Sequence, residues 1–146
     1  MPKSTGVAVE ARFAHPIDTV WALLADFGKL PTLVPGCSGV TITGSGIGAV
    51  RHVPFEQYYT DERLEVMDHA AHRLVYRVIA KAPVVVREDY VAEMKLAADG
   101  PDACRFYWES KFTIPDDADV AVEQAKLHRS YGIAIGGIEA ALAAGV

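Results

Sequence analysis

The first residues of the chain alternate between apolar and polar side chains. From Val7 to Ala14 the odd positions are all apolar, whereas Glu10 and Arg12 occupy the opposite face of an extended chain. A period of two residues is typical of a half-buried β-strand. We therefore expect the chain to begin with a strand that packs one face on a core.

A short helix is predicted directly after this strand. Pro16 is tolerated at a first helical position, and the apolar residues after it recur at helical spacing until Gly28. Segment 29–36 contains two prolines, so it has room for no more than a brief second helix or a turn.

The middle of the chain, 38–113, divides into stretches of strand length. Turn-forming residues separate them at 44–48, 54–57, 68–71, 81–83 and 99–102, which predicts six further strands. Because the connections are short, an antiparallel meander is more economical than parallel pairing, which needs long crossovers.

The last part of the chain predicts a long helix. Pro115 and the acidic residues Asp116, Asp117 and Asp119 open it, with negative charge at the positive end of the helix dipole. Its apolar stripe consists of Leu127, Tyr131, Ile135, Ile138 and Leu142. The stripe must pack on the sheet, so we expect an α+β domain whose seven-stranded curved antiparallel sheet wraps a long C-terminal helix.

Composition and charge restrict the class of protein. The chain has 146 residues, 51% of them hydrophobic, which is the size of one domain, 1–146, with its own core. A net charge of −5 without a Lys/Arg-rich run argues against a nucleic-acid partner. Without a membrane-length apolar run or signal-peptide features, we expect a cytoplasmic monomer or homodimer.

Neither a metal nor a cofactor is expected. Cys37 and Cys104 cannot build a structural zinc site alone, and the five histidines show no ligand spacing. The glycines of segment 44–48 precede a predicted strand rather than a helix, so they do not form a dinucleotide-binding loop.

The order of elements resembles the helix-grip fold of the START-like or SRPBCC superfamily over nearly the whole chain. The motifs that carry the resemblance are Pro16 with Val20-Trp21 and Leu24, segment 30–35, Gly46-x-Gly48-x-Val50-Arg51, and Glu62-Arg63-Leu64 with Asp68. The polyketide cyclase/dehydrase-like branch is closest in pattern. The plant abscisic-acid receptors are more distant, because their gate sequence and ligand-anchoring lysine have no clear counterpart here.

The resemblance implies a deep, largely apolar cavity between the sheet and the last helix. In this superfamily such a cavity binds lipids, hormones or aromatic polyketides, and some members also catalyse a reaction. The partner implied for this chain is a small hydrophobic or aromatic ligand.

Two polar residues are predicted on inward strand faces. On 58–68, Glu62 shares its face with Leu64 and Val66. A carboxylate on this apolar face pairs with a cation, binds a water molecule or stays protonated. The alternative is that Glu62 reaches solvent at the end of the strand. On 84–96, Tyr90 shares its face with Val86, Ala92, Met94 and Leu96, whereas Arg87 lies opposite. A buried Tyr90 hydroxyl needs a partner, either Glu62, a ligand oxygen or another core group.

The strand 104–113 gives two conflicting interpretations. Alternation places Trp108 inside with Cys104, Phe106 and Phe112. The resemblance to the hormone receptors, in contrast, places the carboxylate of Glu109 in the cavity and Trp108 outside. Both alternatives stay open from the sequence.

Other candidates lie near the glycine-rich segment and in the last helix. Arg51 either binds an anionic group of the ligand or forms a salt bridge on the outer sheet face, and the pattern favours the salt bridge. His52 faces the opposite side of the strand.

Segment 54–59 contains three aromatic residues, which form either a lip over the cavity or an ordinary hairpin. The glycines of the last helix make room for a ligand or allow close packing.

Three functions follow as hypotheses. The first is binding of an aromatic or polycyclic ligand, and the second is a cyclase or dehydrase reaction with Glu62, Tyr90 or Glu109 as catalytic candidates. The third is an interaction module, which an outward Trp108 would favour. The residues predicted to bind the ligand are Arg51, Glu62, Leu64, Tyr76, Tyr90, Met94, Glu109, His128, Tyr131, Gly132 and Ile135.

Overall fold

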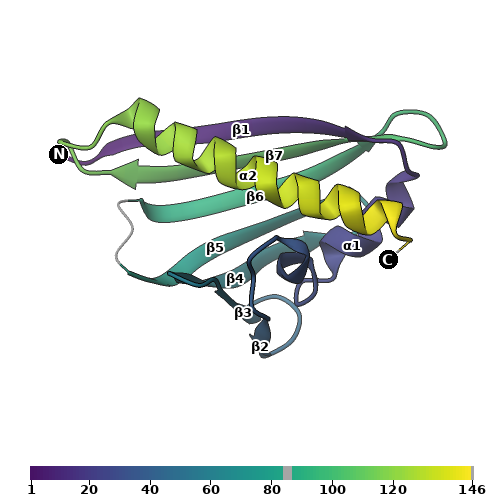
Figure 1. The fold of residues 1–146 in the computed structure, drawn as a ribbon, viewed down its shortest axis with the longest axis horizontal. Helices are drawn as coiled ribbons and strands as arrows, with labels where there is room; N and C mark the ends of the chain where they lie inside the picture. Colours follow the sequence, from purple (N-terminus) through teal and green to yellow (C-terminus); the bar gives the residue numbers. More distant parts are fainter. Residues whose placement is uncertain (84–86, 146) are drawn as a thin grey trace.

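The computed structural model describes residues 1–83 and 87–145, which form one sheet with helices on one of its faces (Figure 1). In chain order the elements are β1 (Lys3–Phe13), α1 (Ile17–Ala25), the 3-10 helix η1 (Leu30–Leu33), β2 (Thr41–Thr43), β3 (Val50–Pro54), β4 (Tyr59–Asp68), β5 (Arg73–Ala82), β6 (Glu88–Ala98), β7 (Cys104–Ile114) and α2 (Val120–Ala143). Neighbouring strands pair antiparallel in the order β1-β7-β6-β5-β4-β3-β2.

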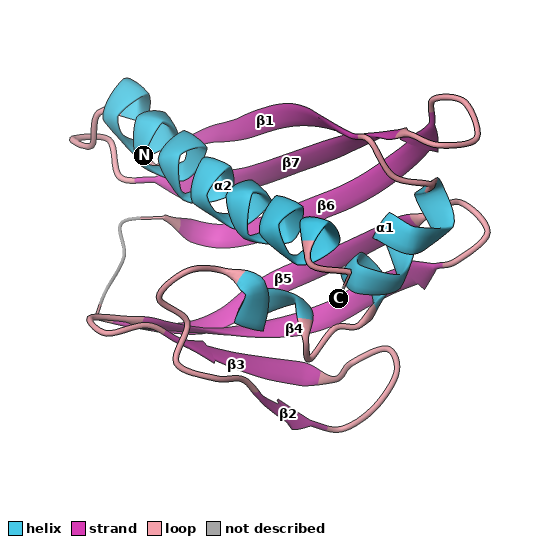
Figure 2. Cartoon of the chain, turned by 45° about the vertical axis from the view of Figure 1, so that its right-hand side comes forward, coloured by secondary structure: helices cyan, strands magenta, loops and turns pink. Residues whose placement is uncertain are grey.

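All the helices lie on the same face of the curved sheet (Figure 2). The long helix α2 crosses this face, and its C-terminal end lies near α1. Two short helices follow the first strand, and the described strands form a sheet of seven. The predicted α+β helix-grip fold is therefore confirmed.

The core lies between the sheet and the helices. β1 and β7 pair without interruption from Lys3 opposite Ile114 to Phe13 opposite Cys104, so alternate side chains of both strands point inward. Phe13 and Phe106, which is also on β7, are almost completely buried. Each such side chain stabilises the fold by about 1.5–3 kcal/mol through burial.

Irregular strand pairing changes which side chains face inward. β4 and β5 shift register twice, and β6 and β7 shift once, next to Asp89, whose φ is +51°. A bulge adds one residue to one strand and reverses the inward face beyond it. The inward position predicted for Val66 is therefore wrong: beyond the bulge after Leu64, Met67 packs on the core instead. Val86, which was expected to face inward, lies outside the described residues.

The helix α2 begins later than Pro115, where the sequence predicts its start. Asp119 is its N-cap, and the Asp119 carboxylate accepts a hydrogen bond from the backbone N–H of Val122 at 3.2 Å. Of the predicted stripe, Ile135 is half-buried and the others are buried: Leu127, Tyr131, Ile138 and Leu142. No helix among the described residues combines the length and the apolar character that crossing a membrane requires.

Gly137 lies where α2 passes close to η1. A Cβ atom at this position would lie 2.1 Å from the carbonyl oxygen of Leu33. At Gly132 and Gly136, which are exposed, a Cβ would meet no atom within 4 Å. Close packing therefore requires glycine at 137 but not at the other two positions.

Gly137→Ala is expected to lower the free energy of unfolding by roughly 1–3 kcal/mol, because the new methyl group forces α2 away from η1. Gly132→Ala is the matched control on the same helix, and it should raise that free energy by up to about 1 kcal/mol through helix propensity. Urea unfolding followed by circular dichroism measures both changes. Equal effects of the two substitutions would contradict the close approach of α2 and η1.

Candidate functional site

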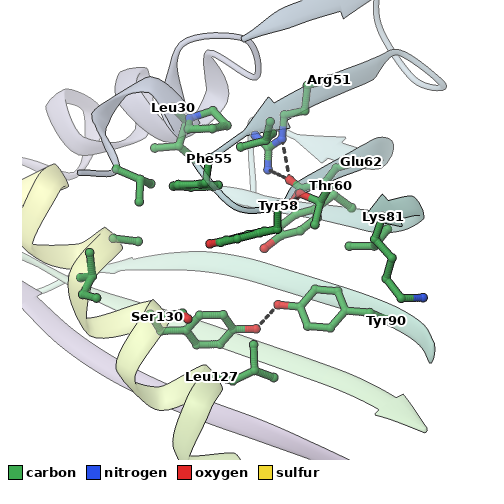
Figure 3. Close-up of a pocket in the computed structure, with 18 of the residues that line it drawn as sticks. Leu30, Arg51, Phe55, Tyr58, Thr60, Glu62, Lys81, Tyr90, Leu127 and Ser130 are labelled. Carbon is green, nitrogen blue, oxygen red and sulfur yellow. Dashed lines mark hydrogen bonds and ion pairs between the residues drawn. The ribbon is translucent and has the colours of Figure 1, made fainter. Parts of the chain in front are cut away.

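A cavity of about 560 Å³ lies between the sheet, η1 and α2 (Figure 3). Strands β3 to β7 contribute side chains to its wall, and α2, η1 and the β3–β4 turn complete it. Most of the lining is apolar or aromatic. The aromatic residues are Phe55, Tyr58, Tyr76, Tyr90, Trp108 and Tyr131.

The first polar group in the wall is an ion pair between Arg51 and Glu62. These residues are directly opposite each other on β3 and β4. Both Nε and Nη2 of Arg51 lie 2.8 Å from Oε1 of Glu62, and the Thr60 hydroxyl donates to Oε2 at 2.9 Å. The side chain of Arg51 is 3% exposed and that of Glu62 is 14% exposed, so Glu62 is the more accessible member of the pair.

Two aromatic rings and a backbone carbonyl hold the Arg51 guanidinium in place. Its carbon lies 4.0 Å from the ring centre of Phe27 and 4.9 Å from that of Tyr76. Nη1 donates to the carbonyl oxygen of Phe27 at 3.0 Å. The outer-face salt bridge that the pattern favours for Arg51 is therefore wrong, because the side chain points inward and Glu62 compensates its charge.

The second polar group is a pair of tyrosine hydroxyls. Tyr90 on β6 and Tyr131 on α2 share a hydrogen bond between their hydroxyl oxygens, which joins the sheet to the helix across the cavity. The ring of Tyr131 also stacks on Trp108, with 3.8 Å between ring centres. These contacts fix the direction of both hydroxyls.

Burial keeps these phenols protonated. It raises the pKa of Tyr131 to about 12, and it raises the pKa of Tyr76 and of Tyr90 well above the ordinary value of 10.0. The negative charge of Glu62 raises all three pKa values further. The wall therefore presents neutral hydroxyl groups beside one compensated carboxylate.

Two further cations line the cavity where β5, β6 and α2 meet. Arg87 donates to Glu123 of α2 at 2.9 Å, and Lys81 donates to Glu88 at 3.0 Å. Glu123 is buried and also accepts from Lys126 at 3.1 Å. Within residues 1–83 and 87–145, no group of three or more His, Cys, Asp or Glu side chains is arranged to hold a metal ion.

Aromatic residues of the β3–β4 turn lie at the rim. The rings of Phe55 and Tyr58 stack 4.8 Å apart, and both line the cavity, although Tyr58 is 43% exposed. Tyr59 does not line it and packs against His52 instead, with 4.8 Å between ring centres. Two of the three aromatic residues of the predicted lip thus lie at the cavity.

The structure brings together a large part of the predicted site. The predicted residues that line the cavity are Arg51, Glu62, Tyr76, Tyr90, Met94 and Tyr131. Their contact with a ligand stays a prediction.

The cavity position that the resemblance implies for Glu109 is wrong. Glu109 is exposed on the outer face of β7, whereas Trp108 is 7% exposed and lines the cavity. β7 pairs regularly with both neighbours at this point, so simple alternation holds. The outward Trp108 that would favour an interaction module is absent.

Four other predicted residues do not line the cavity. Leu64 is buried in the core, and Ile135 is half-buried against it. His128 and Gly132 are exposed. Each of these two residues directly follows a cavity-lining residue of α2. Successive side chains of a helix point in directions roughly 100° apart, so both point away from the cavity.

Sequence patterns missed several lining residues. The bulges in β5 and β6 turn Lys81 and Arg87 inward, and no periodic pattern shows such a change. Leu30 and Val34 line the cavity from η1 and the residue after it. Ala134 was detectable, because it lies three residues after Tyr131 on the same helical face.

Arg51→Met is expected to lower the free energy of unfolding by roughly 2–4 kcal/mol, since it leaves the Glu62 carboxylate without its cation. The double variant Arg51→Met/Glu62→Leu should return to within about 1 kcal/mol of the wild type, because apolar side chains can replace a buried ion pair. Urea unfolding of both variants measures the difference. A double variant no more stable than Arg51→Met would refute this coupling.

Comparisons with known proteins agree with the fold. The family model described as polyketide cyclase / dehydrase and lipid transport matches residues 4–143. No curated protein is found to match the chain.

Solved structures match over nearly the whole chain. An uncharacterised protein from Bacillus thuringiensis has a TM-score of 0.81 at 18% identity, and the match covers 94% of this chain and 98% of that chain. The protein XoxI from Bacillus cereus has a TM-score of 0.81 at 18% identity, with 94% of each chain covered. Norcoclaurine synthase from Thalictrum flavum, in complex with dopamine and hydroxybenzaldehyde, has a TM-score of 0.80 at 16% identity, covering 97% of this chain and 87% of that chain.

At these identities the solved structures establish the fold alone, whereas the family match spans nearly all of the sequence. The chain therefore belongs to the polyketide cyclase/dehydrase and lipid transport family, within the START-like or SRPBCC superfamily of helix-grip proteins.

Proposed function

We propose that this protein binds a hydrophobic, aromatic or polycyclic small molecule in the cavity between its sheet and α2. The observation that carries the proposal is an aromatic-walled cavity of about 560 Å³ with polar atoms at a few places only. Ligand sites in proteins commonly occupy about 300–1,000 Å³ and have this mixture of apolar walls and few polar groups. Burial of the ligand's apolar surface would contribute roughly 25 cal/mol per Å².

The comparisons support binding of this kind. The family description includes lipid transport as well as cyclase and dehydrase proteins. The norcoclaurine synthase structure holds dopamine and hydroxybenzaldehyde, which are small aromatic molecules that carry oxygen. A ligand of the same general chemistry fits the aromatic lining of this cavity.

The polar residues of the wall orient such a ligand in this proposal. Glu62 and the hydroxyls of Tyr90 and Tyr131 face the cavity from three different elements. Arg51 does not clamp an anionic ligand directly, because its side chain is 3% exposed and paired with Glu62. Its role is to hold the Glu62 carboxylate in position.

A cyclase or dehydrase reaction is the second candidate, because Glu62 and the tyrosine hydroxyls line the same cavity. In that case Glu62 is the base, and Tyr90 stabilises the enolate. The contacts favour binding, since Arg51 and Thr60 already donate to the two oxygens of the Glu62 carboxylate and leave it a single open acceptor position.

A reactive aromatic poly-β-ketone tests the two candidates. A positioned base would speed its ring closure by roughly a hundredfold or more, and we expect no such acceleration by the wild-type protein. Ring closure is followed by liquid chromatography with and without protein. A large acceleration that Glu62→Gln abolishes, with the fold retained, would show that the cavity catalyses.

Ala134→Phe is expected to weaken ligand binding at least about tenfold, because the larger side chain fills space that the ligand needs. Ala134 lies on the cavity face of α2. The probe is unsubstituted flavone, and ligand-dependent melting is the measurement, because a ligand at a hundred times its Kd stabilises a protein by about 2.7 kcal/mol.

Ala140→Phe is the matched control, since Ala140 is exposed on the same helix and does not line the cavity. It should keep the wild-type shift in melting temperature. Unchanged binding by Ala134→Phe, with both variants folded, would show that flavone binds elsewhere and would count against the proposed function.

A further inference from the structure

We infer that the ligand is a neutral hydroxylated aromatic ketone, whose hydroxyl group donates to Glu62 and whose carbonyl oxygen accepts from the Tyr90–Tyr131 pair. The inference rests on the proposed function and gives it a definite substrate class. Its basis is the hydrogen-bonding positions that Glu62 and the tyrosine pair leave open in the cavity wall.

Glu62 has one acceptor position open. A carboxylate has about four such positions, two on each oxygen. Nε and Nη2 of Arg51 both approach Oε1, and the Thr60 hydroxyl donates to Oε2. The open position is therefore on Oε2, in a side chain that lines the cavity. It requires a donor from the ligand, such as a hydroxyl group.

The tyrosine pair has one donor open. Each hydroxyl carries one proton, and the hydrogen bond between Tyr90 and Tyr131 uses one of the two. The other proton is available to an acceptor in the cavity or to a neighbouring hydroxyl, since Ser110 lies beside Tyr131 and Tyr76 lies beside Tyr90. Because burial raises the pKa of both groups, that proton stays in place at neutral pH. A carbonyl oxygen of the ligand is the acceptor that fits.

The charges of the wall favour a neutral ligand. Each cation among the described lining residues has a carboxylate partner: Arg51 has Glu62, Lys81 has Glu88, and Arg87 has Glu123, which it shares with Lys126. An anionic group beside Glu62 would therefore lie next to a carboxylate whose own cation is already paired. Burying such a charge costs several kcal/mol.

The rings that surround the two polar positions favour an aromatic skeleton. Tyr76 and Tyr90 lie side by side, with 6.3 Å between ring centres, and Phe55 and Tyr58 stack at the rim. Planar rings pack well against such surfaces in offset or edge-to-face geometry. An aromatic ketone that carries a hydroxyl group far from its carbonyl group would pack against these rings. It would also donate to Glu62 and accept from the tyrosine pair at the same time.

Three flavonoid probes test each hydrogen bond separately. They are 7-hydroxyflavone, its methyl ether 7-methoxyflavone, which lacks the donor, and 7-hydroxyflavan, which lacks the carbonyl group. Affinities are measured by calorimetry in mildly acidic buffer, where the phenol is uncharged. We expect 7-hydroxyflavone to bind the wild-type protein about tenfold or more tightly than either of the others.

Two double variants assign the preferences to their residues. Arg51→Met/Glu62→Leu removes the carboxylate together with its cation, so it should abolish the preference for hydroxyl over methoxy and keep the preference for the ketone. Tyr90→Phe/Tyr131→Phe should do the reverse. Tyr107→Phe, a tyrosine on β7 that does not line the cavity, is the matched control and should keep both preferences.

The wild-type affinities decide the inference even if a variant does not fold. Equal binding of all three probes would overturn the inference and leave the proposed function intact. Preferences that survive in the folded double variants would also overturn it, because other groups would then carry them. If none of the three probes binds, the proposed function fails for aromatic ligands, and the inference fails with it.

Discussion

The buried ion pair of Arg51 and Glu62 determines how the short helices and strands β3 and β4 are held around the cavity. A guanidinium that is 3% exposed must have a compensating charge, and Glu62 supplies it from the directly opposite position on β4. The same guanidinium bonds the carbonyl oxygen of Phe27, between α1 and η1, and lies between two aromatic rings. The pair therefore connects the segment between the two short helices to the sheet and presents a carboxylate to the cavity.

The sequence predicts the elements well, because alternation and helical spacing depend only on local geometry. Alternation predicts the inward face of Trp108 correctly, because β7 pairs regularly with both neighbours there. Glu62 and Tyr90 also line the cavity as predicted, although each lies at a register shift of its strand. The sequence does not predict that Lys81 and Arg87 line the cavity, because bulges turn these side chains inward. One extra residue reverses the alternation of a strand, and the order of polar and apolar residues does not show where this occurs.

The two errors in the candidate site with the largest consequences have different physical origins. The resemblance to a distant branch implies that Glu109 lies in the cavity, whereas the regular pairing of β7 places it on the outer face. The prediction that His128 and Gly132 line the cavity fails because an apolar stripe shows which face of α2 is buried but not which edge of that face borders a cavity. That edge depends on where η1 approaches the helix, at Gly137, and this contact is distant in the sequence.

Native mass spectrometry of the protein purified from its own cells tests the central claim most directly, which is that the cavity holds a small aromatic molecule. The account predicts a complex with a small excess of mass, whose ligand is released on denaturation and absorbs as an aromatic compound. Tight binding would preserve such a complex through purification. A folded protein that shows only its bare mass, even after incubation with the neutral aromatic fraction of its own cell extract, would contradict the account.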